Sequence, residues 1–111
     1  MTPLFSPCTR CSHPAITAAR QCKAAMAMAN DGRPQEAQAM LKTAMGSLRR
    51  ANLPMMKAKL LNSLGLVYAQ QNRPLQAMRC LTSSLRIVAG QVGTDNWLYA
   101  RIAANRDKLA A

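Results

Sequence analysis

The sequence predicts an all-α domain, and three of its features carry that prediction. Apolar residues recur at helical spacing through most of the chain, so that each segment has one apolar face. No segment shows the alternation of apolar and polar residues that is typical of a half-buried strand. Proline recurs at the points where the helical pattern restarts. At 111 residues, the chain has the length of one domain.

Five helices are expected, and proline marks the start of the first four. Proline suits the first helical position because its missing N–H would have no partner there and its φ is already helical. Ser12 or His13 is the expected cap of the first helix, and Asp95 that of the last, after a turn at residues 90–94. The expected helices cover about residues 14–30, 34–50, 54–71, 74–89 and 95–110.

The last helix, over residues 95–110, is expected to close the domain. Its apolar side chains would face inward and its basic ones outward, because the capping helix at the end of a repeat array needs a polar outer face. The inward set is Trp97, Leu98, Ile102 and Leu109, and the outward set is Arg101, Arg106 and Lys108. We therefore expect one helical domain over residues 13–111, preceded by a flexible tail over residues 1–12.

Two copies of one pattern lie in register, at a shift of 40 positions from Pro34 to Pro74. Each copy has its own Arg-Pro turn, Gly32-Arg33-Pro34 in the first and Asn72-Arg73-Pro74 in the second. The other matched pairs are Ala24/Leu64, Ala25/Gly65, Met28/Tyr68, Ala37/Ala77, Leu41/Leu81, Ala44/Ser84 and Leu48/Val88. Two units in register are a stronger signal than one, because leucine-rich helices are common.

The second copy, LLNSLGLVYAQQNRPLQAMRCL, resembles the tetratricopeptide repeat (TPR), a helix-turn-helix unit that stacks on its neighbours. The residues that match the W-x2-L-G-x2-Y and A-x3-F pattern of the family are Leu64, Gly65, Tyr68 and Ala77. Leu61 stands where the family has Trp, Leu81 where it has Phe, and no proline closes the unit. The usual period of the family is about 34 residues. We interpret the extra residues here, near 51–56, as lengthened helices.

The resemblance implies a right-handed array of antiparallel helix pairs, with about two TPR-like repeats and a C-terminal capping helix. Gly65 would let a neighbouring helix approach closely, since a glycine within a helix usually has a packing reason. The expected core residues of the better copy are Leu61, Leu64, Tyr68, Ala77, Leu81 and Leu85.

The resemblance also implies a binding groove, because the first helix of each repeat lines an inner face that takes an extended peptide or a helix. In the better copy the implied groove positions are Lys59, Asn62, Leu66, Ala69 and Gln70. In the weaker copy they are Ala19, Cys22, Met26, Ala29 and Asn30. The floor would be mostly apolar with a polar edge, which suits an amphipathic helix or a hydrophobic segment.

The formal net charge of +11 constrains the partners of the chain more than its fold. Acidic protein, nucleic acid and anionic membrane all match a basic surface. The basic residues are spread over all five expected helices and are locally dense only over residues 49–59. No segment has the ~18 apolar residues that a membrane span needs, and the N-terminus has no signal-peptide pattern. A cytoplasmic protein without a membrane partner is the expectation.

Three thiols and one imidazole, from Cys8, Cys11, His13 and Cys22, raise the question of a zinc site. Their spacing disfavours it, since a single residue separates Cys11 from His13 and no second ligand pair closes the site. A disulfide or redox role for Cys8 and Cys11 lacks the strand-helix context of thioredoxin-like motifs, and haem attachment lacks its histidine. We expect no metal and no cofactor, a tail with free thiols, and Cys22 and Cys80 in helix packing.

Catalysis has little support in the sequence. His13 is the single histidine, and no phosphate loop or hydrolase motif is present. The chain is therefore expected to be no enzyme but a protein-interaction module, an adaptor or chaperone-like protein that binds a peptide or an amphipathic helix. The alternative is a basic helical protein associated with nucleic acid. Self-association is also expected, because an open apolar groove exposes surface that a second copy would cover.

Overall fold

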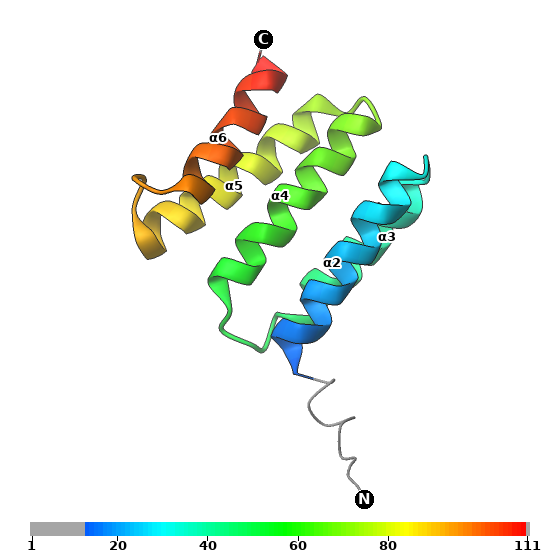
Figure 1. The fold of residues 1–111 in the computed structure, drawn as a ribbon, viewed down its shortest axis with the longest axis horizontal. Helices are drawn as coiled ribbons and strands as arrows, with labels where there is room; N and C mark the ends of the chain where they lie inside the picture. Colours follow the sequence, from blue (N-terminus) through cyan, green and yellow to red (C-terminus); the bar gives the residue numbers. More distant parts are fainter. Residues whose placement is uncertain (1–12, 111) are drawn as a thin grey trace, which may run out of the picture.

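The computed structural model describes residues 13–110 of the chain. In this part the chain forms five helices and no strand, which confirms the all-α prediction (Figure 1). The helices are α2 (Pro14–Asn30), α3 (Pro34–Ser47), α4 (Pro54–Gln70), α5 (Pro74–Val92) and α6 (Trp97–Ala110). The predicted flexible tail over residues 1–12 lies outside the described residues.

The helices pack mainly on their neighbours in the chain. Helix α2 lies along α3, and α4 lies along α5, each pair being joined by a short turn (Figure 1). Helix α4 also contacts α2 and α3, so that it lies between the first pair and the rest of the domain. Helix α6 packs on α5 and touches α4. Side chains of α4 therefore have neighbours from every other helix of the described domain.

The turns that follow α2 and α4 have the same backbone conformation. Gly32 and Asn72 stand at equivalent positions and both have a positive φ, of 81° and 62°. Their N–H groups bond to carbonyls of the preceding helix at 3.1 and 3.0 Å, and those of Arg33 and Arg73 do so at 2.9 Å in both turns. This is the hydrogen-bond pattern of a Schellman motif, which closes a helix end. The repeat seen in the sequence is thus a repeat of local structure.

Most of the matched positions are buried in both copies. In four matched pairs both residues have an exposure of at most 5%. The first residue of each pair lies in α3 or directly after it, and the second lies in α5. The pairs are Ala37/Ala77, Leu41/Leu81, Ala44/Ser84 and Leu48/Val88. The pair Ala24/Leu64 differs, since Ala24 is exposed and Leu64 is buried. Leu64 has α3 beside it, whereas no helix of the described residues stands in that place next to α2.

The predicted core of the better copy is confirmed. Its six residues are buried, with exposures between 0 and 9%: Leu61, Leu64, Tyr68, Ala77, Leu81 and Leu85. Gly65 lies where α4 packs closely against α5. A Cβ atom there would lie 2.9 Å from Cγ and Cδ2 of Leu81 and 3.3 Å from the carbonyl oxygen of Ala77. Glycine therefore has the packing role that the sequence predicted for it.

Several predicted helix boundaries were wrong. Helix α3 ends at Ser47, so the extra residues near Ala51 lie in a connection over 48–53 and not in a longer helix. Helix α5 continues through Gly90 and ends at Val92, because the next residue, Gly93, has a φ of 83° that stops it. The predicted turn at 90–94 is therefore shorter than expected. Gly90 has a helical backbone conformation, so it weakens the helix without ending it. A residue with a positive φ, such as Gly93, cannot continue a right-handed helix.

The last helix also differs from its prediction at its start. Its cap is Asn96 instead of Asp95, because Asn96 Oδ1 accepts a hydrogen bond from the Tyr99 N–H at 2.8 Å. Trp97 is 70% exposed, so the prediction that it faces inward was wrong, while Ile102 is fully buried as predicted. At the other end of the domain, His13 caps α2 by accepting a bond from the Ala15 N–H at 3.1 Å.

Candidate protein-interaction site

The predicted groove residues lie on α2 and α4, which contact each other. Two polar contacts join these helices. The Cys22 sulfur lies 3.1 Å from Ser63 Oγ, and Gln70 Nε2 donates to the carbonyl oxygen of Ala29 at 2.8 Å. The side-by-side placement of α2 and α4 thus depends in part on residues that the sequence assigned to the groove.

The exposure of the predicted groove residues is uneven. The exposed ones are Ala19, Asn30, Lys59 and Gln70, and the partly buried ones are Cys22, Met26, Asn62, Leu66 and Ala69. Ala29 is buried at 3% exposure and belongs to the core, and Met26 packs against that core. The buried apolar side chains of the described residues form two core clusters, a larger one from α2 to α5 and a smaller one that joins α4, α5 and α6. Leu66 is half-buried and belongs to neither cluster. The face formed by these residues on α2 and α4 is called the inner face below.

Helix α6 extends the inner face by one residue that sequence reasoning missed. Asn105 Nδ2 donates to Asn62 Oδ1 at 3.0 Å, so α6 meets α4 beside the predicted groove position. Little in the sequence indicated this contact, because an isolated asparagine on a helix is usually exposed to solvent. The contact appears only when the packing of α6 is known.

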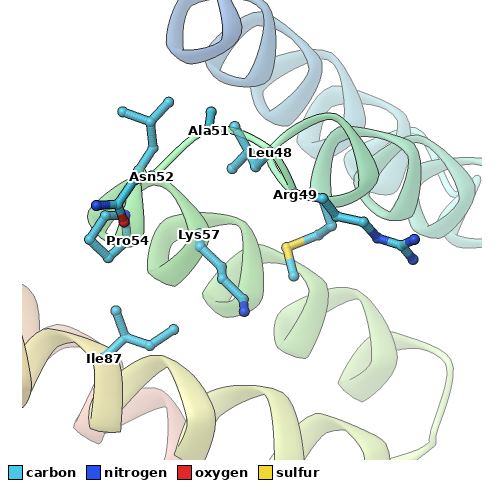
Figure 2. Close-up of a pocket in the computed structure, with 9 residues that line it drawn as sticks. Leu48, Arg49, Ala51, Asn52, Pro54, Lys57 and Ile87 are labelled. Atoms are coloured by element: carbon cyan, nitrogen blue, oxygen red, sulfur yellow. The ribbon is translucent and has the colours of Figure 1, made fainter.

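A second surface feature lies on the other side of α4, between α3 and α5. It is a cavity of about 410 Å³ (Figure 2), which adjoins a second cavity of about 360 Å³ that shares some of its lining residues. The shared residues are Met45, Arg49 and Lys57. Together, the two cavities are called the basic groove. Its lining is Lys42, Met45, Gly46, Leu48, Arg49, Ala51, Asn52, Leu53, Pro54, Lys57, Leu64 and Ile87.

The basic groove and the inner face use different sides of α4. Lys57 lines the basic groove and Lys59 belongs to the inner face. Because successive helical residues are rotated by about 100°, these two side chains point about 200° apart around the helix. A ligand on one surface therefore need not touch the other.

The four acidic residues of the chain all lie away from the basic groove. Asp31 and Glu36 are within 3.9 and 3.5 Å of Arg33, and Asp107 is 3.7 Å from Arg106. The fourth, Asp95, lies in the turn before α6. No acidic residue lines the basic groove, so Lys42, Arg49 and Lys57 form a cluster of like charge there.

Lys42, which lines the basic groove, lies near an aromatic ring and influences a thiol. The Lys42 ammonium lies 6.0 Å from the centre of the Tyr68 ring, within the range of a cation–π contact. Burial raises the pKa of the Cys80 thiol, and the positive charge of Lys42 partly opposes that rise. Cys22 and Cys80 are free thiols and both pack partly against the core, as the sequence predicted.

The metal prediction rests mainly on residues that the structure does not describe. Cys8 and Cys11 lie outside the described residues, so the expectation of a metal-free tail stays a prediction. Over residues 13–110, no three His, Cys, Asp or Glu side chains cluster in a way that could hold a metal ion. None of the helices in the described part of the chain has both the length and the apolar character needed to cross a membrane.

Comparisons with protein-family models, curated protein sequences and solved structures gave no match to this chain.

Proposed function

We propose that the chain is a protein-interaction module made of two TPR-like units and a closing helix. In this proposal α2 with α3 and α4 with α5 are antiparallel pairs stacked in a right-handed array. The observation that carries it is the duplicated turn, with a positive φ at Gly32 and Asn72 and the same hydrogen bonds in both copies. Repetition of a whole helix-turn-helix unit, including its buried positions, is typical of proteins that build a continuous binding face from stacked units.

The proposed ligand is a peptide or an amphipathic helix of another protein, bound on the inner face. Leu66 supplies apolar surface that the two core clusters leave unused. Lys59 is exposed two turns away on the same helix, where it would position the backbone or an acidic side chain of the ligand. Binding energy would come from a few apolar anchors, with the polar edge setting the register.

Binding rather than catalysis is proposed because the titratable side chains have other roles. The single histidine, His13, uses its Nδ1 atom as a helix cap. Three of the four carboxylates are within ion-pair distance of an arginine that neighbours them in the sequence. General acid–base catalysis needs such groups to meet in one site.

The second candidate function is association with nucleic acid, favoured by the excess of fifteen basic over four acidic residues. The two candidates respond differently to salt. Phosphate binding weakens steeply as salt rises because counterions are released on binding, whereas an apolar anchor loses little. Salt dependence therefore separates them without knowledge of the partner.

The test is capture of partners from native lysate with and without nuclease, at low and moderate salt, followed by mass spectrometry. The test variant is Lys59→Glu with Leu66→Glu, since neither side chain belongs to a core cluster. Met26 is avoided because it packs against the core. The control variant, Arg79→Glu with Arg86→Glu, changes two exposed residues of α5.

We expect nuclease-resistant partners that survive moderate salt, are lost with the test variant and are kept by the control. Circular dichroism should show equal helicity for all three proteins. Loss of the partners in the control, or on nuclease treatment, would favour the nucleic-acid function instead.

A further inference from the structure

We propose that the basic groove between α3 and α5 is a second docking site, whose occupant is an acidic amphipathic segment of another protein. This surface is separate from the inner face, so the proposal goes beyond the function proposed above and can fail independently of it. The occupant is specified by two properties of the groove, its apolar floor and its uncompensated positive charge.

The floor of the groove is apolar and adaptable. Leu48 is buried at 5% exposure, and Met45, Leu53 and Ile87 are partly buried. Figure 2 shows Ile87 on α5 facing the space that the 48–53 connection borders from the opposite side. Methionine has a flexible and polarisable side chain, which lets a surface of this kind adjust to different apolar partners. Apolar side chains of a ligand that packed on this floor would be removed from water, which favours binding.

The rim of the groove is positively charged. Lys42, Arg49 and Lys57 are exposed and line the groove. Figure 2 shows Lys57 extending from α4, while the Arg49 side chain starts on the opposite side and extends outward, away from Lys57. No salt bridge involves them within residues 13–110. Like charges on one surface repel each other. Carboxylates of a ligand would be attracted to these basic side chains and would reduce the repulsion between them. Charge complementarity of this kind favours an acidic partner and disfavours a basic one.

An acidic protein segment explains the groove better than nucleic acid does. Proteins that bind single strands stack the bases on exposed aromatic rings, and no aromatic residue lines this groove. Tyr68 lies near Lys42 but is 8% exposed, so its ring face is not available for stacking. A site for duplex phosphates alone would have no use for an apolar floor. A helix with leucines on one face and glutamates beside them satisfies both parts of the groove.

The proposal is tested with a fluorescein-labelled helical peptide that repeats the unit Leu-Glu-Glu-Leu-Leu-Glu-Ala, measured by anisotropy against the full-length protein. A second peptide has Gln in place of every Glu, and a third probe is a single-stranded DNA oligonucleotide. The groove variant is Arg49→Glu with Lys57→Glu. Arg79→Glu with Arg86→Glu is its matched control, because it changes the net charge by the same amount on exposed residues of α5 outside the groove.

We expect saturable binding of the Glu peptide, with loss of about tenfold or more in affinity for the groove variant and a change of less than about threefold for the control. Amide chemical-shift changes in the wild-type protein should cluster at residues 42–57 and around Ile87. The inner-face variant Lys59→Glu with Leu66→Glu should bind the Glu peptide like wild type, which separates failure of this proposal from failure of the proposed function.

Four outcomes would overturn the proposal. The wild-type protein could bind no Glu peptide, or bind the Gln peptide equally well, which would remove the charge argument. Both charge variants could lose affinity equally, which would indicate a general effect of net charge. Tighter binding of the oligonucleotide with competition at the same resonances would assign the groove to nucleic acid.

Discussion

Replacement of Gly65 tests the packing of α4 against α5 most sharply. A Cβ at this position would lie 2.9 Å from Cγ and Cδ2 of Leu81, closer than carbon atoms approach without repulsion. Leu81 is fully buried, so it has little room to retreat, and the Ala77 carbonyl oxygen at 3.3 Å belongs to the backbone of α5. The added methyl group must therefore push two helices apart or force Leu81 out of its rotamer.

The expected magnitude follows from two opposing terms. Alanine is favoured over glycine within a helix by about 1 kcal/mol, and overpacking of a core costs about 1–3 kcal/mol. Gly65→Ala should therefore lower the free energy of unfolding by about 1 kcal/mol, and Gly65→Leu by roughly 3 kcal/mol or more. For a domain of this size each kcal/mol corresponds to a fall in Tm of roughly 4–8 °C.

The assay is thermal and urea unfolding followed by circular dichroism, with two matched controls. Gly46 and Gly90 are also helical, but a Cβ at either position meets no atom within 4 Å. Alanine at these positions should raise the stability by about 0.5–1 kcal/mol, because only the helix propensity changes. If Gly65→Ala stabilised the protein as the controls do, the close approach of α4 and α5 would be wrong.

Three further predictions concern single side chains, each checked by one measurement. Gly32→Val should cost about 1–2 kcal/mol in urea unfolding, because a branched side chain is strained at its φ of 81°; an unchanged midpoint would contradict the turn geometry. Ser84→Ala should cost about 1 kcal/mol, since the buried hydroxyl donates to the Ala58 carbonyl at 2.6 Å, and a neutral result would mean that this bond contributes nothing. Iodoacetamide should alkylate Cys80 with an apparent pKa above that of a free thiol, and Lys42→Met should raise it further. The stability contributed by burial of the neutral Cys80 thiol is fully present below the pKa that this thiol has in the unfolded chain. It is lost as the pH rises through the higher pKa of the folded protein. A Cys80-dependent stability that instead falls as the pH is lowered would contradict this account.

The sequence predicted the start of every helix from α2 to α5. Proline fixes these starts because it is tolerated at the first helical position and breaks the pattern elsewhere. Gly65 was also identified correctly, since a glycine inside a helix costs stability unless packing requires it. These are local signals, and they do not depend on what the rest of the chain does.

Features that depend on tertiary packing were predicted less well. Trp97 was expected to face inward because it is apolar, but it is 70% exposed, and it is the next two residues of α6, Leu98 and Tyr99, that pack against the core. The basic groove combines Arg49, Lys57 and Ile87 from three different elements, so no window of the sequence contains it. The only sequence signal was the local density of basic residues over 49–59.

The central claim is that the chain binds another protein through its inner face, and site-specific photo-crosslinking tests it most directly. A benzophenone amino acid at Leu66 places the reactive group on that face, and the same amino acid at Arg79 on α5 serves as the control. After irradiation in nuclease-treated native lysate, we predict a discrete crosslinked protein from position 66 and none from position 79. Crosslinking from position 79 alone, or loss of the position-66 product on nuclease treatment, would contradict the claim.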